Sequence, residues 1–233
     1  MKELSVIIPT YNEEMRLPAT LTKVVNFLAD QKTNNEIIIS DGASTDKTVD
    51  FVHNFLSRIP IKLIRQKRRE GKGAGVKEGM LEARGDWILF MDADNSTAIL
   101  QLKKLAKYRK EFDVIIGSRY ARVEARVKQS FVRRFISRLG SRLIKMITGL
   151  KINDTQCGFK LFSRAAAKKI FHALETKGWG FDVEVLLLAQ KFGYKIKEVP
   201  VVWRDAEGTH LRAIQDSFKT LGEIWRIKRR LGR

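Results

Sequence analysis

Residues 4–13 read Leu4-Ser5-Val6-Ile7-Ile8-Pro9-Thr10-Tyr11-Asn12-Glu13, a continuous apolar run that ends abruptly in polar residues. Similar apolar runs stand at residues 36–40, 61–64, 87–91 and 114–117, and segments with a helical spacing of apolar residues, such as 18–28 and 75–83, lie between them. Strands that are apolar throughout and alternate with helices are typical of a parallel sheet covered on both faces. The sequence therefore predicts a doubly wound, mostly parallel α/β fold whose ligands bind beyond the carboxyl ends of the strands.

The composition indicates one large globular domain with an anionic partner. Of the 233 residues, 44% are hydrophobic, which is enough for a substantial core. Lysine and arginine number 45 against 26 acidic residues, which gives a formal net charge of +19. Residues 120–151 hold nine basic residues and one acidic residue, and residues 212–233 hold seven and two. The excess charge is therefore concentrated in two short segments, and it favours binding to something anionic.

Three of the predicted strands end in polar, acidic segments, at residues 9–14, 41–46 and 92–95. Asp92 and Asp94, two residues apart on leaving an extended strand, point to the same side. Carboxylates together with phosphate oxygens are the ligands that Mg²⁺ and Mn²⁺ prefer. A lone Asp-x-Asp is more often a solvated turn or a helix cap, but three acidic strand ends on one sheet edge favour a metal that bridges a nucleotide diphosphate.

Several other enzyme classes lack their motifs in this sequence. The turn at Pro9–Asn12 is not the glycine-rich turn of a Rossmann dinucleotide site, and Gly71–Gly75 lacks the Lys-Ser/Thr ending of a P-loop. The glycine-rich run is either a place where backbone approaches a ligand closely or simply a loop. There is no HExxH or Gly-x-Ser-x-Gly motif. The single cysteine, Cys157, excludes a disulfide scaffold, and we interpret it as a packing residue rather than a nucleophile.

Motifs in both halves of the chain resemble the family 2 glycosyltransferases. In the first half they are Ser5–Glu13, Asp41–Asp46 and Asp92–Asp94, and in the second half Gly117–Tyr120, Asp154–Phe162 and Trp179–Glu184. The second set is similar to dolichyl-phosphate glucosyltransferases and to their relatives, the dolichyl-phosphate mannose synthases. The resemblance implies a GT-A fold over residues 1–211, with a nucleotide-sugar half at 1–119 and an acceptor half at 120–211, followed by a basic amphipathic helix at 212–233.

The resemblance also implies an activity. It is the metal-dependent, inverting transfer of a hexose, with glucose favoured, from a nucleotide sugar to a polyprenyl phosphate, with Mg²⁺ or Mn²⁺ as cofactor. UDP-glucose is the expected donor, and a dolichyl-type phosphate is the expected acceptor. Two alternatives stay open: a mannose synthase that uses GDP-mannose, and a GT-A transferase with another acceptor.

Position by position, the resemblance assigns site residues. The nucleobase and ribose of the donor are assigned to Pro9, Tyr11, Glu13 and Asp41, and Gly73 of the glycine-rich run is placed with them. Asp92 is expected against the donor and, with Asp94, on the metal. The acceptor phosphate is assigned to Arg119, Arg133 or Arg134, Lys160 and His210, while Glu184 is either near the sugar or structural. Asp154 is either a base or an ion-pair partner that positions Arg119 or Lys160, since a phosphate with a second pKa of about 6 is mostly ionised at neutral pH and needs no strong base.

Some positions depart from the mannose synthase pattern. That pattern has an arginine shortly before a Gly-Ser-Lys-Leu string, whereas here Arg204 is offset from that arginine and His210 stands in the place of the lysine. Asn95 stands where mannose synthases carry another residue after the Asp-x-Asp. The acceptor segment and the metal shell therefore differ here from that pattern.

Residues 130–148 and 218–231 carry apolar residues on one helical face and Lys or Arg on the other. Such helices lie in a membrane interface, where each basic residue near an anionic leaflet adds roughly 1 kcal/mol; the alternative is a core-packing helix with a solvated basic face. No apolar run approaches the roughly 20 residues that span a bilayer. We therefore expect a cytoplasmic enzyme attached peripherally to the cytoplasmic face of a membrane. No nucleic acid is expected as partner, because the sequence lacks basic segments interleaved with aromatic residues.

Overall fold

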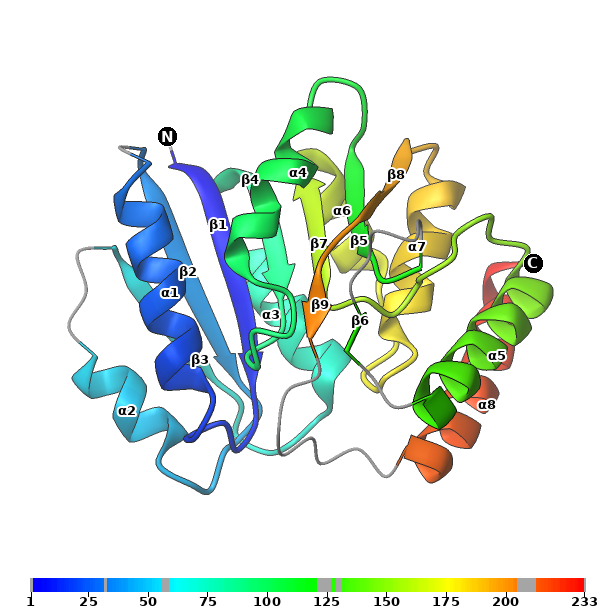
Figure 1. The fold of residues 1–233 in the computed structure, drawn as a ribbon, viewed down its shortest axis with the longest axis horizontal. Coiled ribbons are helices and arrows are strands. Elements are labelled where there is room, and N and C mark those ends of the chain that lie inside the picture. The colour runs from blue at the N-terminus through cyan, green and yellow to red at the C-terminus, as the bar shows by residue number, and fades with distance from the viewer. Residues whose placement is uncertain are drawn as a thin grey trace.

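A seven-stranded sheet runs through the middle of the molecule, with helices on both of its faces (Figure 1). The structure, a computed structural model, describes residues 2–31, 33–55, 59–120, 127–128, 131–204 and 213–232. The strand order is β3-β2-β1-β4-β7-β5-β8, in which β7 runs antiparallel to both of its neighbours and the other pairs are parallel. The strands are β1 (Lys2–Thr10), β2 (Asn35–Asp41), β3 (Ile61–Arg65), β4 (Gly85–Met91), β5 (Val114–Ser118), β7 (Phe159–Ser163) and β8 (Ile196–Pro200).

The helices and the remaining short elements complete the fold. The α-helices are α1 (Leu17–Ala29), α2 (Thr48–Asn54), α3 (Lys72–Glu82), α4 (Leu102–Leu105), α5 (Phe131–Thr148), α6 (Arg164–Ala173), α7 (Phe181–Lys191) and α8 (Ala213–Leu231). The 3-10 turns η1 (Ile99–Gln101) and η2 (Ala106–Tyr108) flank α4, and β6 (Val127–Lys128) pairs with β9 (Trp203–Arg204). Within the described ranges, no helix is both long enough and apolar enough to cross a bilayer.

The strands are apolar throughout because alternate residues enter two different hydrophobic layers. Ile7 of β1 lies in the layer that contains residues of α3, α6 and α7. Its neighbour Ile8 lies in the opposite layer, with residues of α1 and α4. Helices α5 and α8 join the first layer through Ile144 and Ile224. The predicted doubly wound α/β architecture is confirmed.

Strand β7 lies between β4 and β5 and is not predicted by the apolar pattern of the sequence, because Lys160 interrupts an otherwise apolar segment. The register pairs Lys160 with Phe90 of β4 on one side and with Ile116 of β5 on the other. One sheet therefore contains strands from both predicted halves of the chain.

Helix α3 begins at Lys72, three residues earlier than the sequence pattern predicts, so the glycine-rich run is the first turn of a helix. Gly71, just before it, has a φ of 117°, which favours glycine. A Cβ at Gly71 would lie 2.4 Å from the backbone oxygen of Lys177. The backbone of this run is therefore packed against the segment between α6 and α7, and its close approach to a ligand stays a prediction.

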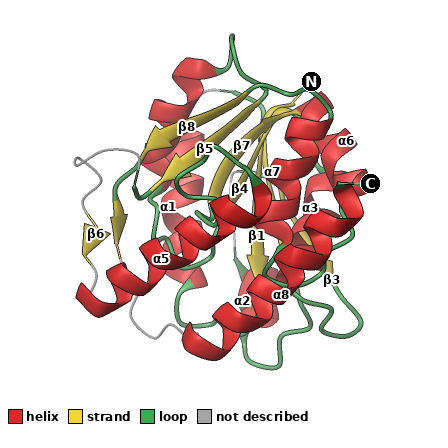
Figure 2. Cartoon of the chain, turned by 90° about the vertical axis from the view of Figure 1, so that its right-hand side faces the viewer, coloured by secondary structure: helices red, strands yellow, loops and turns green. Residues whose placement is uncertain are grey.

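Helices α5 and α8 lie side by side at one end of the molecule, and α8 also contacts α7 (Figures 1 and 2). The side chains of Ile144, Ile224 and Ile227 are buried, which explains part of the amphipathic pattern by packing. Trp225 and Met146 are 54% and 79% exposed. These two large apolar side chains are left on the outer surface of the pair.

Strand β7 also carries a charge into the core. Lys160 is only 1% exposed, and its ammonium group is held by the carboxylate of Asp182 in α7 and by the backbone oxygen of Cys157, 2.7 Å away. Burial raises the pKa of Asp182, and the charge of Lys160 opposes that rise. Removing one member of such a pair leaves an uncompensated buried charge, which destabilises a protein strongly.

We predict that Lys160→Met lowers the free energy of unfolding by about 3 kcal/mol or more, because Asp182 loses its partner. The double variant Lys160→Met/Asp182→Leu should recover much of that loss, since neither charge remains. Urea unfolding followed by circular dichroism measures both. If the single variant is as stable as the double variant, the pair does not act as described.

Candidate active site

The carboxyl ends of β1, β2 and β4 meet at one edge of the sheet, because these neighbours run parallel. Asp92 follows β4 directly, and its backbone N–H donates to the oxygen of Gly158, 3.1 Å away, just before β7. The carboxylate of Asp92 rests on this glycine: a Cβ at Gly158 would lie 1.9 Å from Asp92 Oδ2. The glycine of the Asp154–Phe162 motif therefore makes room for the carboxylate.

Glu13, Asp92 and Asp94 form an acidic group at this edge. Burial raises the pKa of Glu13 to about 6; Arg16, 2.7 Å from both carboxylate oxygens, opposes that rise, and the charges of Asp94 and Asp92 add to it. Burial and then the charge of Asp92 raise the pKa of Asp94. Because these carboxylates repel one another, a cation placed among them would be stabilised.

Asp92 and Asp94 fit a divalent cation that takes its remaining ligands from a substrate. Across the described ranges, no three His, Cys, Asp or Glu side chains are arranged to hold an ion. Mg²⁺ is nevertheless commonly held by one or two carboxylates together with substrate phosphates and water. Asn95 follows the pair with a φ of 54°, and its buried Oδ1 has no hydrogen-bond partner among the described residues. The available ligands are all oxygens, which suits Mg²⁺ or Mn²⁺.

Tyr11 and Asp41 take different positions beyond β1 and β2. The half-buried ring of Tyr11 is covered by the guanidinium of Arg69, 3.8 Å from its centroid. Asp41 is fully buried, and its carboxylate accepts hydrogen bonds from Thr10 Oγ1 (3.1 Å) and from the backbone N–H (2.9 Å) and hydroxyl of Ser44. Asp41 therefore anchors the turn after β2, while Tyr11 and Arg69 form a stacked pair beside it.

Two other predicted donor residues lie on β1 and α3. Pro9 is half-buried in β1, opposite Ser40 of β2. A Cβ at Gly73 would lie 2.5 Å from the backbone oxygen of Thr176 and 2.7 Å from the Cβ of Phe181. The packing of the chain itself thus requires a glycine at position 73, and its contact with a donor stays a prediction.

On the other side of the site, Arg119 and Asp154 form a buried ion pair. The backbone N–H and Nε of Arg119 donate to Asp154 Oδ2 (2.9 and 2.8 Å), and Nη2 donates to Oδ1 (2.9 Å). Burial alone would lower the pKa of Arg119 and raise that of Asp154, but their attraction outweighs burial and shifts both the opposite way. A carboxylate with a lowered pKa is a poor base, so this geometry favours Asp154 as the residue that positions Arg119.

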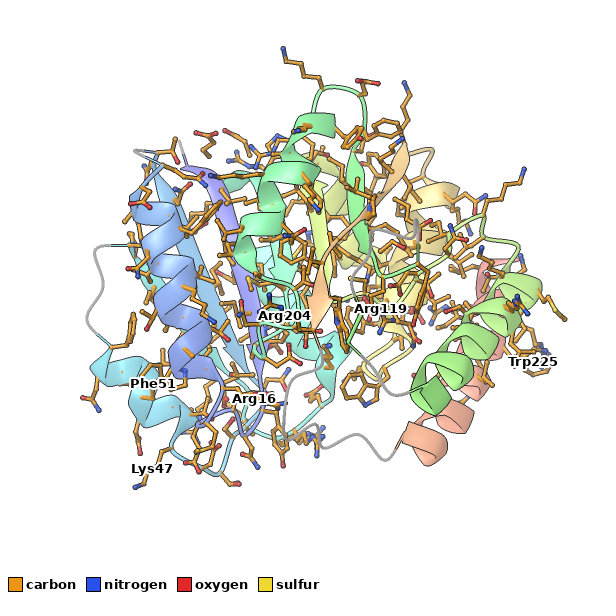
Figure 3. The ribbon with its side chains drawn as sticks, in the orientation of Figure 1. Arg16, Lys47, Phe51, Arg119, Arg204 and Trp225 are labelled. Carbon is orange, nitrogen blue, oxygen red and sulfur yellow. The ribbon has the colours of Figure 1, made fainter. Side chains whose placement is uncertain are left out.

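Strand β9 brings this ion pair close to the acidic edge. The backbone N–H of Arg204 donates to the oxygen of Ser96 (2.9 Å), two residues after Asp94. Trp203, beside it in the chain, lies with its ring 5.6 Å from the guanidinium of Arg119. Figure 3 shows Arg119 and Arg204 on the side of the sheet at which the parallel strands end. The cationic and acidic parts of the site therefore share one edge.

The other predicted acceptor residues take varied positions. Lys160 neutralises the buried Asp182, and its contact with a lipid phosphate stays a prediction. The side chains of Arg133 and Arg134 and the whole of His210 lie outside the described residues. Cys157 is buried, and burial raises the pKa of its thiol to about 12, which agrees with a packing role.

Glu184 occupies a structural position. Its carboxylate is fully buried and accepts the backbone N–H groups of Glu175 (3.0 Å) and Thr176 (2.9 Å). It also forms an ion pair with Arg230 of α8. Glu184 thereby ties the C-terminal helix to the segment between α6 and α7.

Sequence reasoning did not identify Lys72 and Trp179 as site residues. The Nζ of Lys72 lies 2.7 Å from Asp92 Oδ1 and 4.9 Å from the centroid of the Trp179 ring. Both residues stand in motifs that the sequence displays, but the glycine-rich run indicates a close approach of its backbone and gives no role to the side chain of Lys72. No pattern in the sequence indicates that Lys72 lies beside Asp92, because an ion pair between distant residues leaves no periodic signal.

A family model described as Glycosyl transferase family 2 matches residues 5–171. A dolichyl-phosphate beta-glucosyltransferase from Dictyostelium discoideum is 36% identical, over 97% of this chain and 73% of its own length. The Saccharomyces cerevisiae protein of that name is 37% identical over 95% of this chain and 72% of its own, and the Homo sapiens protein is 32% identical over 90% and 70%.

Solved structures share the fold at lower sequence identity. Glucosyl-3-phosphoglycerate synthase from Mycobacterium tuberculosis, in complex with phosphoglyceric acid, matches with a TM-score of 0.72 and 17% identity over 97% of this chain and 80% of its own. Its complex with Mn²⁺ and UDP-glucose matches with a TM-score of 0.70 and 16% identity, over 97% and 79%. These likenesses concern the fold alone and confirm the predicted GT-A type. With the family model matching most of the chain, this protein belongs to the family 2 glycosyltransferases.

Proposed function

We propose that this chain transfers glucose from UDP-glucose to dolichyl phosphate or a similar polyprenyl phosphate, with inversion at the anomeric carbon. The observation that carries the proposal is the meeting of an acidic edge, at Asp92 and Asp94, with the Arg119–Asp154 pair. The two parts are linked through β9: the N–H of Arg204 donates to the oxygen of Ser96, and the neighbouring Trp203 ring lies 5.6 Å from the guanidinium of Arg119. The names of relatives that are 32–37% identical support glucose and dolichyl phosphate as substrates.

On the donor side, the acidic edge would hold a metal–diphosphate group. Asp92 and Asp94 would bind Mg²⁺ or Mn²⁺, which when present neutralises charge on the departing nucleoside diphosphate. Tyr11, backed by Arg69, offers an aromatic face for the nucleobase. Glu13, held by Arg16, offers carboxylate oxygens for the hydroxyl groups of the ribose.

On the acceptor side, Arg119 would orient the phosphate of the lipid. Its guanidinium is fixed by Asp154 and flanked by the rings of Tyr120 and Trp203, 5.2 and 5.6 Å away. Arginine suits phosphate because its planar donors match phosphate oxygens in pairs. Holding two anions together is the main task of such a site, and fixed cations do this with little reorganisation.

The reaction then needs no protein base. At neutral pH the lipid phosphate is mostly ionised, since its second pKa is about 6. Its oxygen forms a bond to the anomeric carbon from one face, while the bond from that carbon to the donor's β-phosphate oxygen breaks on the other. The electron pair leaves with the nucleoside diphosphate, and an α-linked donor gives a β-linked product.

The paired helices α5 and α8 supply a surface for the membrane that carries the acceptor. Trp225, at the outer edge of the molecule in Figure 3, stacks against the guanidinium of Arg229, 4.8 Å from its ring centroid. Met146, Arg142 and Arg226 are also exposed on these helices. Exposed apolar groups among basic residues are typical of helices that lie in an anionic interface.

We predict that UDP-glucose with Mn²⁺ raises the melting temperature of the protein, because a ligand present at 100 times its dissociation constant stabilises the native state by about 2.7 kcal/mol. Thermal-shift measurements with UDP-glucose and GDP-mannose test the choice of donor. Asp94→Asn should remove the metal-dependent part of the shift and slow transfer on the order of 100-fold or more. Asp30→Asn, on an exposed carboxylate, is the control. Stabilisation by GDP-mannose alone would overturn the glucosyl proposal.

We predict that Glu13 makes stability fall as pH rises from 4.5 to 7. Its pKa is about 6 in the native state against 4.5 in a free side chain, so its contribution is complete below pH 4.5 and is lost as pH rises through 6. The loss should be about 2 kcal/mol relative to Glu13→Gln. Urea unfolding of both proteins across this pH range measures it. Mn²⁺ with UDP should reduce the difference in unfolding free energy between the two proteins. Equal pH profiles for the two proteins would contradict the raised pKa of Glu13.

We predict that the intact chain binds vesicles containing phosphatidylserine through α8. Arg226→Gln/Arg229→Gln should weaken binding by about 30-fold, from roughly 1 kcal/mol for each charge. The double variant Lys103→Gln/Lys104→Gln, which removes the same charge from α4, should bind like the unchanged protein. Vesicle flotation measures all three, and equal losses in the two double variants would show that only total charge matters.

A further inference from the structure

Lys72 lies beside Asp92 in the site, and the proposed reaction gives it no role. It is the first residue of α3, and its Nζ lies 2.7 Å from Asp92 Oδ1. The rings of Trp179 and Phe90 stand 4.9 and 5.6 Å from the ammonium group. The side chain is 20% exposed, so it is within reach of a ligand that occupies this edge.

The backbone of Lys72 is held firmly, whereas its side chain is long and flexible. The glycines on either side of it, Gly71 and Gly73, are packed against the backbone oxygens of Lys177 and Thr176. The N–H of Ala74 also donates to the oxygen of Lys177, 3.3 Å away. A movement of the ammonium group must therefore come from the side-chain torsions, which are enough to carry it a few ångströms from one anion to the next.

The position of Lys72 conflicts with a bare metal ion at Asp92. The ammonium group already neutralises one oxygen of a carboxylate that would hold a divalent cation, and two cations on one carboxylate repel each other. A donor diphosphate removes this conflict, because it brings negative charges that accept the ammonium group. Lysine is well suited to such an exchange, since its charge is compact and its stem has four rotatable carbons.

We infer that Lys72 is a donor-binding residue that exchanges Asp92 for the diphosphate of the nucleotide sugar, so that metal and nucleotide bind cooperatively. This inference rests on the proposed function, because it takes a metal-bound nucleoside diphosphate as the ligand of the acidic edge. In the empty protein Lys72 is paired with Asp92 and competes with the bare ion, which therefore binds weakly. In the loaded protein it contacts the phosphate and leaves Asp92 to the metal.

Lys72→Met separates these two effects, because it removes the charge but keeps a similar length. Binding of Mn²⁺ alone, measured by the electron paramagnetic resonance signal of the free ion, should become about tenfold tighter. Binding of UDP in the presence of Mn²⁺, measured by calorimetry, should become at least tenfold weaker. The factor by which UDP tightens the binding of Mn²⁺ should therefore fall. By thermodynamic reciprocity, the factor by which Mn²⁺ tightens the binding of UDP must fall equally.

Two further variants complete the experiment. Lys72→Arg keeps a cation and should retain most of the cooperativity, while Lys62→Met, at an exposed ion pair on β3, should change neither affinity. Circular dichroism checks that each variant is folded. If Lys72→Met leaves either the affinity for Mn²⁺ alone or that for UDP unchanged, the inference is wrong although the proposed function stands. If the unchanged protein binds neither UDP nor UDP-glucose with Mn²⁺, both are wrong.

Discussion

Neutralisation of carboxylates that are wholly or partly buried is the constraint on which the active edge depends. Five carboxylates near it pair with cations: Glu13 with Arg16, Asp41 with Arg65, Asp92 with Lys72, Asp154 with Arg119 and Asp182 with Lys160. Taking such groups out of water costs several kcal/mol each unless they are paired. Asp94 has no ion-pair partner in the part of the chain that the structure describes. Asp94 is therefore the carboxylate whose charge a bound cation would neutralise.

The antiparallel strand β7 makes this pairing possible. It enters between β4 and β5, and it places Lys160 in the core and Gly158 directly under the carboxylate of Asp92. The most specific motif of the sequence, Asp154–Phe162, thus also has a packing role. Its glycine makes room for the carboxylate of Asp92, and its lysine pairs with the buried Asp182.

The sequence predicted the parts of this fold that depend on local pattern. Strands buried on both faces leave continuous apolar runs, so five of them were found within a few residues of their observed bounds. Strand β7 was missed because Lys160 breaks its apolar run, and the charge of that lysine is neutralised by Asp182, 22 residues away. The role of Asp154 was likewise undecidable from spacing, since Arg119 lies 35 residues earlier. Ion pairs between distant residues leave no periodic signal.

The two basic segments that dominate the charge of the chain become neighbours only through the fold. Helix α8 is docked on the segment behind the donor site: Glu223 accepts the N–H of Gly180 (2.8 Å), next to Trp179, whose ring faces Lys72. A Cβ at Gly180 would lie 2.9 Å from the carboxylate of Glu223, so the two segments are closely packed at this contact. A displacement of α8 would therefore break a contact with the segment that carries Trp179. The helix proposed to contact the membrane therefore also packs against the segment that carries Trp179, whose ring lies beside Lys72, the proposed donor-binding residue.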